Sequence, residues 1–278
     1  MPNPSVATRW SAPPFVTASV GLHALAAGAA ALLPEVAWWA LGGVVLNHAG
    51  LTAAGLWPRS SLLGPNHTRL PAAAATRAAF ALTLDDGPDP EVTPRVLDVL
   101  DAHRVRATFF CIAERARTHA ALVREIVARG HDVQNHSDGH RHHFALLGPA
   151  ALAREIGRAQ EGLADLVGQR PHCFRAPAGL RNPFLDPVLH RHDLHLVSWT
   201  RRGFDTATAD AQRVLQRLSG APAAGDILLL HDGHAGRGEH GTPVVLEVLP
   251  ALLARYRQAG LHAVTLREAL PPRSAASR

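Results

Sequence analysis

The sequence contains no lysine, only two cysteines and few aromatic residues. Its 28 basic residues are all arginine, and its formal net charge is +5 at pH 7. The arginines are spread along the chain and aromatic side chains do not alternate with them, so the sequence predicts no nucleic-acid surface. Cys111 and Cys173 both lie in apolar segments. This excludes a disulfide framework and favours two buried free thiols over a single disulfide bond.

Charged residues are also missing from two long N-terminal segments. Residues 15–33 contain none, and residues 36–57 contain only Asn47, His48 and Thr52 as polar positions. A membrane-spanning helix needs about 20 apolar residues. We therefore predict a hydrophobic helical hairpin in a membrane, within an N-terminal segment of residues 1–57. A pair of buried alanine-rich helices and a signal peptide are the two alternatives.

The charges that flank these segments predict an orientation. Arg9 precedes the first run, Glu35 lies between the two, and the next charged residues, from Arg59 on, are arginines. The positive-inside rule then places both ends of the hairpin in the cytoplasm. We expect a bacterial-type inner-membrane protein whose remaining domain faces the cytoplasm. That domain would lie outside if only one run spans the membrane or if the first is cleaved.

After the hairpin, the hydrophobic pattern changes to alternating short strands and amphipathic helices. We predict a linker over 58–77, one domain over 78–270 and a disordered tail over 271–278. The predicted strands are 80–84, 107–112, 131–135, 172–175, 194–198, 226–231 and 261–265, and the predicted helices are 92–103 (capped by Thr93), 117–129, 149–167, 184–191, 207–219 and 242–259. This alternation is typical of a parallel α/β sheet, open or closed into a barrel. Chemistry in such folds gathers at the carboxyl ends of the strands.

Two adjacent carboxylates end the first predicted strand. Asp85 and Asp86 follow the predicted strand 80–84 and precede a Gly-Pro break. Two carboxylates held close together cost energy unless a cation or a proton takes up the charge. The pair therefore predicts a cation at this strand end.

Two histidines follow the third predicted strand and can supply further ligands. His136 and His140 are four residues apart, so one helical turn would place both imidazoles on one face. Together with one carboxylate of the doublet they predict a metal site of a kind that suits zinc. His142 and His143 are nearby alternatives, which we assign to the following loop.

The strand-end motifs resemble those of the polysaccharide deacetylases of carbohydrate esterase family 4, the NodB-homology domain. The resemblance spans about residues 80–266 and includes four motifs: Thr83-Leu84-Asp85-Asp86-Gly87-Pro88, His136-Ser137-Asp138-Gly139-His140, Arg175-Ala176-Pro177-Ala178-Gly179 and Leu229-Leu230-His231. It implies a deformed (β/α)7 barrel, which agrees with the seven predicted strands.

The resemblance also implies a role for each motif residue. Asp86, His136 and His140 would bind a divalent metal ion, usually zinc. Asp85 would be the general base, held ionised by Arg175. His231 would be the general acid, and the backbone N–H of Ala178 would help to stabilise the oxyanion.

The sequence departs from the family pattern at three places, of which Leu84, where the family often has Phe, should change the packing only. An aromatic residue often stands where this chain has Ala178, so a wall that faces the sugar could be missing. The family's fourth motif often contains Asp-x-x-Asp-Trp, whereas this region reads Trp199-Thr200-Arg201-Arg202-Gly203-Phe204-Asp205. Asp205 is the candidate for the carboxylate that orients His231, with Asp226 and Asp232 as competitors.

The expected function is that of a metal-dependent hydrolase. It would remove N-acetyl groups from an amino sugar in a glycan or, given a membrane hairpin, in a lipid-linked saccharide. A deformylase or another C–N hydrolase on the same scaffold is one alternative. A non-catalytic metal- or carbohydrate-binding domain is another, but it predicts loss of the base or the acid, and Asp85 and His231 are both present.

Overall fold

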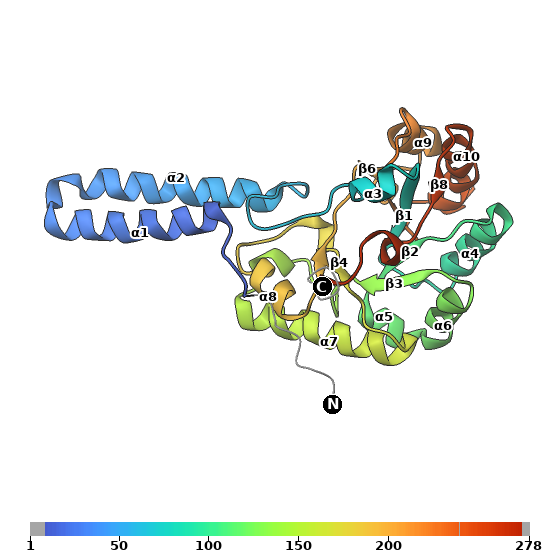
Figure 1. The fold of residues 1–278 in the computed structure, drawn as a ribbon, viewed down its shortest axis with the longest axis horizontal. Coiled ribbons are helices and arrows are strands. Elements are labelled where there is room, and N and C mark those ends of the chain that lie inside the picture. Colours follow the sequence, from blue (N-terminus) through green and yellow to red (C-terminus); the bar gives the residue numbers. More distant parts are fainter. Residues whose placement is uncertain (1–8, 239, 274–278) are drawn as a thin grey trace.

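The structure, a computed structural model, describes residues 9–238 and 240–273. It consists of a long helical hairpin that projects from an α/β unit (Figure 1). The hairpin contains helix α1 (Pro14–Leu32), a short 3-10 turn (Pro34–Val36) and helix α2 (Ala37–Leu56). These bounds confirm two helices joined by a short turn, and their insertion in a membrane stays a prediction. Among the described helices, α1 alone is long and apolar enough to cross a membrane, a test that a signal sequence also passes.

The polar side chains of the hairpin face each other. Asn47 Nδ2 donates to Ser19 Oγ at 2.7 Å, and the Nε2 atoms of His23 and His48 lie 3.1 Å apart. Large apolar side chains point outward instead, and two tryptophans near the tip, Trp38 and Trp39, are 79% and 84% exposed. The hairpin thus pairs these four polar side chains internally and presents large apolar side chains to its surroundings.

The α/β unit is built on one parallel sheet. Its strands are β1 (Ala79–Asp85), β2 (Thr108–Cys111), β3 (Asp132–Asn135), β4 (Cys173–Phe174), β5 (His195–Leu196), β6 (Arg201–Arg202), β7 (Ile227–His231) and β8 (His262–Ala263). They follow the order β5-β4-β3-β2-β1-β7-β6, with β8 paired to the start of β1. All seven predicted strands are present, and β6 is an additional short one. The sheet curls into an open barrel, as the family resemblance implied, and its two end strands in this order are β5 and β6.

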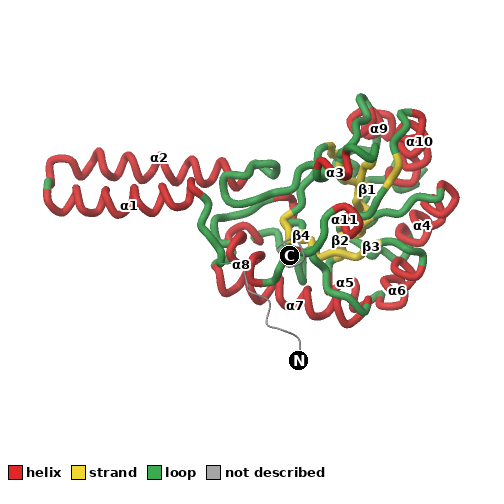
Figure 2. The backbone as a smooth tube through the Cα atoms, in the orientation of Figure 1, coloured by secondary structure: helices red, strands yellow, loops and turns green. Residues whose placement is uncertain are grey.

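Helices surround the sheet (Figures 1 and 2). They are α3 (Ala72–Ala75), α4 (Val92–His103), α5 (Ala113–Thr118), α6 (Ala120–Ala128), α7 (Pro149–Val167), α8 (Leu185–Arg191), α9 (Ala211–Ser219), α10 (Val244–Gln258) and α11 (Leu266–Ala269), with 3-10 turns at Phe144–Leu146 and Pro177–Gly179. The predicted helix 117–129 is divided at His119, which has non-helical dihedral angles. The prediction that Thr93 caps α4 is wrong. Asp89 Oδ1 instead accepts from the Glu91 and Val92 N–H groups, and Thr93 lies inside the helix.

Alternation along the strands separates two apolar clusters. Leu82, Leu84 and Leu230 face outward and pack under the surrounding helices. Ala81 and Ile227 face inward, into a smaller cluster closed by α3 and α11. Cys111 and Cys173 are both buried and free, as predicted. The carboxyl end of the barrel is left for polar groups.

Residues 58–77 lie along the α/β unit. Ser198 Oγ donates to Pro58 O at 2.6 Å, Ser198 N to His67 O at 2.9 Å, and Leu70 N to Gly225 O at 2.9 Å. The hairpin is therefore joined to the α/β unit through a bound segment. Of the tail predicted over 271–278, residues 274–278 lie outside the described residues.

Candidate metal-binding active site

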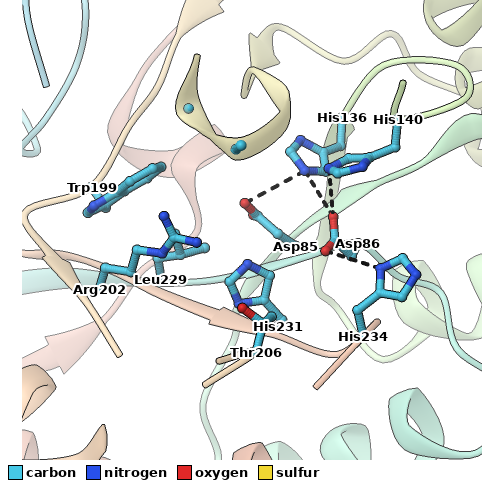
Figure 3. A pocket seen from close by; sticks show the side chains of 12 residues that line it. Asp85, Asp86, His136, His140, Trp199, Arg202, Thr206, Leu229, His231 and His234 are labelled. Atoms are coloured by element: carbon cyan, nitrogen blue, oxygen red, sulfur yellow. Dashed lines mark hydrogen bonds and ion pairs between the residues drawn. The ribbon is translucent and has the colours of Figure 1, made fainter. Parts of the chain in front are cut away.

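The doublet that ends β1 divides into two carboxylates with different partners. The pairing of β1 places Asp85 opposite His231 of β7. Asp86 follows with a φ of +71°, a left-handed conformation that turns the chain at the strand end. Both carboxylates then reach one cavity, although successive side chains of a regular strand point to opposite faces (Figure 3).

Asp86 lies against the two histidines of the loop after β3. Its Oδ1 atom is 3.2 Å from His136 Nε2 and 3.1 Å from His140 Nε2. The prediction that one helical turn aligns these histidines is wrong. They lie on a loop in which Ser137 and His140 have φ values of +67° and +47°, and Ser137 Oγ accepts from the His140 N–H.

These three side chains fit a divalent metal ion. One ligand atom from each of Asp86, His136 and His140 lies within 4.8 Å of the other two. His136 Nδ1 donates to the Arg175 carbonyl at 2.9 Å, which leaves the Nε2 lone pair free to bind a metal. Asp86 Oδ1 is buried and has no hydrogen-bond partner among the described residues. A buried carboxylate oxygen with two imidazole nitrogens beside it is a donor set that binds zinc and related ions.

The electrostatics of the three ligands agree with this fit. Burial raises the pKa of Asp86, but the close contact with His136 and the charges of His136, His140 and His231 lower it well below its usual range. Burial and the charge of His136 lower the pKa of His140 to about 4. Burial lowers the pKa of His136, yet the two carboxylates raise it above its ordinary value, which shows that their field favours positive charge here. Metals bind ionised carboxylates and neutral imidazoles.

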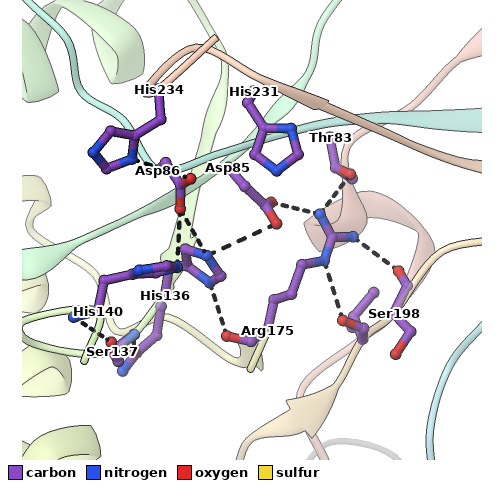
Figure 4. A network of polar contacts seen from close by, with 12 residues as sticks. Thr83, Asp85, Asp86, His136, Ser137, His140, Arg175, Ser198, His231 and His234 are labelled. Atoms are coloured by element: carbon purple, nitrogen blue, oxygen red, sulfur yellow. Dashed lines mark hydrogen bonds and ion pairs between the residues drawn. The ribbon is translucent and has the colours of Figure 1, made fainter. Parts of the chain in front are cut away.

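Arg175 holds the other carboxylate of the doublet. Its Nη1 atom donates to Asp85 Oδ1 at 2.6 Å and to Thr83 Oγ1 at 2.7 Å, and its other N–H groups donate to the carbonyls of Val197 and Ser198 (Figure 4). The guanidinium also stacks 4.1 Å from the centre of the Phe110 ring. Arg175 is 1% exposed. This fixed, buried cation balances the charge of the Asp85 carboxylate and holds it in place.

His231 is held by one of the three predicted carboxylates. Its Nδ1 atom donates to Asp205 Oδ1 at 2.9 Å, and its backbone N–H donates to Asp205 Oδ2 at 2.8 Å. Asp226 instead accepts from Arg201, and Asp232 accepts from the Thr93 hydroxyl. Burial lowers the pKa of His231, but the hydrogen bond and charge of Asp205 raise it above its ordinary value.

Ala178 lines the cavity from the loop after β4. It has a φ of +54° within the turn Pro177–Gly179. The next residue, Gly179, is packed so closely that an added Cβ would lie 2.6 Å from Trp199 and 2.7 Å from Pro58. The loop backbone therefore lies directly at the cavity wall, as the proposed backbone donor requires.

Among the cavity-lining residues that were not predicted as site residues, three bring charged, hydroxyl or imidazole groups: Arg202, Thr206 and His234. His234 Nδ1 lies 3.4 Å from Asp86 Oδ2, and Arg115 donates to His234 Nε2 at 2.6 Å. The spacing of His234, three residues after His231, was a signal in the sequence. For Arg202 and Thr206, the only signal in the sequence was their position close to Asp205. The cavity has a volume of about 160 Å³.

Comparison with known proteins is consistent with this geometry. The model of the polysaccharide deacetylase family matches residues 73–197. A chitooligosaccharide deacetylase from a Bradyrhizobium strain is 36% identical over 58% of this chain and 73% of its own length. A solved peptidoglycan N-acetylglucosamine deacetylase is 26% identical with a TM-score of 0.67, covering 75% of this chain and 94% of that one. A family 4 acetyl xylan esterase from Clostridium thermocellum, solved with a cobalt ion, is 30% identical with a TM-score of 0.62, covering 69% and 89%.

Proposed function

The chain belongs to the polysaccharide deacetylase family, and we propose that it hydrolyses the N-acetyl group of an amino sugar with the aid of a divalent metal ion. One observation carries the proposal. A metal-ligand set, a carboxylate held by a buried arginine and a histidine held by a buried carboxylate all open into one cavity. A site for metal or sugar binding alone needs neither of the last two pairs.

The first part of the mechanism concerns attack on the amide. Asp86, His136 and His140 hold the ion, which we propose is zinc. When bound, such an ion lowers the pKa of a water molecule and offsets the negative charge that develops on the amide oxygen. Asp85 takes the proton of the attacking water, and its hydrogen bond from Arg175 fixes the carboxylate in the cavity. The backbone N–H of Ala178 donates to the oxyanion.

The second part concerns departure of the amine. His231 is paired with Asp205 through Nδ1, so its Nε2 atom is the one that can give a proton to the leaving nitrogen. Asp85 and His231 are register partners on adjacent strands, which places base and acid side by side at the barrel rim. Asp205 stabilises the protonated imidazole and acts as a positioning residue.

The substrate class follows from the relatives. Curated relatives are named chitooligosaccharide and peptidoglycan N-acetylglucosamine deacetylases. We therefore propose an N-acetylated saccharide as the substrate. A lipid-linked saccharide is the finer proposal, because the hairpin presents an apolar outer surface and ends directly at the α/β unit.

We further propose that both hairpin helices insert in a membrane and that the catalytic domain, residues 78–270, faces the cytoplasm. The exposed Trp38 and Trp39 and the polar pair of Asn47 and Ser19 between the helices support insertion. Labelling of single cysteines introduced beyond residue 70, with an impermeant reagent on intact cells, checks the orientation. Labelling without permeabilisation would refute the cytoplasmic placement.

The reaction is tested with the full chain in detergent or lipid discs. Matched N-acetyl and N-formyl amino sugars are supplied, and the released acetate or formate is quantified together with bound metal. We expect acetate release that Asp85→Asn reduces by at least about 100-fold, with metal content retained. Asp165→Asn, the same change on the exposed face of α7, is the matched control. Formate release alone would identify a deformylase, and equal activity of Asp85→Asn would refute the assignment of the base.

A further inference from the structure

The cavity contains one cationic side chain that the proposed reaction does not use. Arg202 lies on β6, where it is the register partner of Leu229 on β7. Leu229 and His231 point to the same face, and both line the cavity. Arg202 therefore faces the barrel interior, about two residues or roughly 7 Å along the strand from the level of His231. Figure 3 shows it on the Trp199 side of the cavity.

The neighbouring arginine, Arg201, differs from Arg202 in both direction and partners. Arg201 points away from the barrel interior, and its Nε atom donates to Asp226 Oδ2 at 2.9 Å. Arg202 forms no ion pair within residues 9–238 and 240–273. Its Nε atom is buried without a hydrogen-bond partner in the same part of the chain. A partly buried guanidinium with an unpaired N–H group is costly unless an acceptor binds it.

Aromatic contacts hold the Arg202 side chain in place but do not supply acceptors for its N–H groups. The centre of its guanidinium lies 5.3 Å from the Trp199 ring and 4.8 Å from the Phe204 ring. Such stacking uses the faces of the guanidinium and leaves the N–H edges free. Those edges match a phosphate or carboxylate, with which arginine forms two parallel hydrogen bonds.

The other charges around the cavity leave this position positive. Asp85 is paired with Arg175, Asp86 belongs to the proposed metal site and Asp205 is paired with His231. Burial lowers the pKa of Arg175, and the nearby positive charge of Arg202 lowers it further, although Asp85 opposes both. Thr206, another polar residue that lines the cavity, is uncharged.

We propose that Arg202 binds an anionic group, a phosphate or a carboxylate, carried by the saccharide substrate on or beside the acetylated sugar. The substrate is then an acidic N-acetyl amino sugar. That the ligand is a saccharide substrate rests on the proposed function. That Arg202 binds its anionic group does not. Arg202 is a specificity residue, since it lies about two residues along the strand from the level of His231 and the other groups that carry out the reaction.

The test compares anionic and neutral members of a matched set: N-acetylglucosamine 1-phosphate, N-acetylmuramic acid and methyl N-acetylglucosaminide. Binding to the metal-loaded full chain is measured by calorimetry on an Asp85→Asn background, so no turnover is needed. The value of kcat/KM is measured separately on the chain with Asp85 intact. We expect an anionic ligand to bind about 10- to 100-fold more tightly than the neutral one. Preference for the phosphate or for the carboxylate identifies the anion.

Three arginine variants complete the test. Arg202→Gln should reduce the ratio of anionic to neutral affinity to about threefold or less, and Arg202→Lys should retain part of it because lysine keeps the charge but lacks the planar fork. Arg158→Gln, on the exposed face of α7, should leave the ratio unchanged. Thermal unfolding of each variant checks that it is folded.

The outcomes separate the two proposals. No anionic preference in the parent protein, a preference that survives Arg202→Gln, or an equal loss for charged and neutral ligands would overturn the inference. An Arg202-dependent preference in binding without any deacetylation would instead support the inference and refute the proposed reaction.

Discussion

Replacement of Asp205 by asparagine is the sharpest test of the acid. In the structure Asp205 is fully buried, and its two oxygens accept from the ring Nδ1 and the backbone N–H of His231 at 2.9 and 2.8 Å. The asparagine side chain would be nearly the same size but could supply only one acceptor oxygen. The protonated imidazole would therefore lose a charged partner while the packing stays almost unchanged.

The magnitude follows from the geometry of the pair. Two unit charges about 4 Å apart interact by roughly 4 kcal/mol at an effective dielectric constant of 20. A hydrogen bond to a charged group contributes about 1.5–3 kcal/mol to stability. Since 1.36 kcal/mol corresponds to one pKa unit, Asp205→Asn should lower the pKa of His231 by about 1 to 3 units.

The sign of the effect on activity is fixed by the role of His231. The general acid must be protonated, so activity falls as the pH rises through its pKa. The carboxylate of Asp205 raises that pKa. Its removal should move the alkaline limb of kcat/KM toward lower pH by about 1 to 3 units and reduce the maximal rate.

The assay is a pH–rate profile at saturating metal, with metal content measured at each pH. Asp165→Asn again serves as the matched control on the exposed face of α7. Movement of the limb in Asp205→Asn alone supports the assignment. An alkaline limb that stays within about 0.3 units of the parent would refute the argument that Asp205 tunes His231.

Three further predictions test other parts of the site. His140→Ala should weaken metal binding by at least about 10-fold, measured by competition with a chelator, and equal affinity would remove His140 from the ligand set. Arg175→Met should reduce kcat by about 100-fold or more and lower stability by about 3–5 kcal/mol, because Asp85 would be left as an unpaired buried carboxylate; unchanged activity in a folded variant contradicts the pairing argument. Burial and the nearby charges of Asp85 and Asp86 raise the pKa of Asp232 to about 7, although the hydrogen bond from Thr93 lowers it. The contribution of Asp232 to the free energy of unfolding therefore declines as the pH rises from about 4 to 7, and stays level above that. Asp232→Asn should therefore stabilise the protein more at pH 8 than at pH 4 in denaturant titrations, and an equal effect at both pH values would show that Asp232 is ionised throughout.

Much of the fold could be predicted from local patterns. The seven strands, the main helices and the hairpin each depend on runs of apolar residues whose period or length is visible in the sequence. Errors occurred where a contact distant in sequence decides the local structure. Thr93 has the chemistry of a helix cap, but its hydroxyl donates to Asp232, 139 residues away. The short strand β6 forms because Arg201 and Arg202 pair with β7, not because of their own propensity.

The motifs predicted the family, which the comparisons confirm, and they predicted which residues meet. Strand ends of a parallel sheet share one edge, so residues that follow different strands come together without any knowledge of distances. The choice among Asp205, Asp226 and Asp232 lay beyond such reasoning, because all three are buried acids close to β6 and β7 in sequence. Side-chain direction decides it: Asp205 reaches His231, whereas Asp226 faces Arg201.

The sequence by itself determined the chemistry of the protein: two carboxylates, two histidines, an arginine and a further histidine, each at the end of a predicted strand. Only the tertiary structure decided which of these side chains contact one another. The left-handed turn at Asp86 sends one carboxylate to the histidines and leaves Asp85 to Arg175. Only the structure revealed that Arg202 lies in the same cavity, because a side chain without a motif becomes informative once its neighbours in space are known.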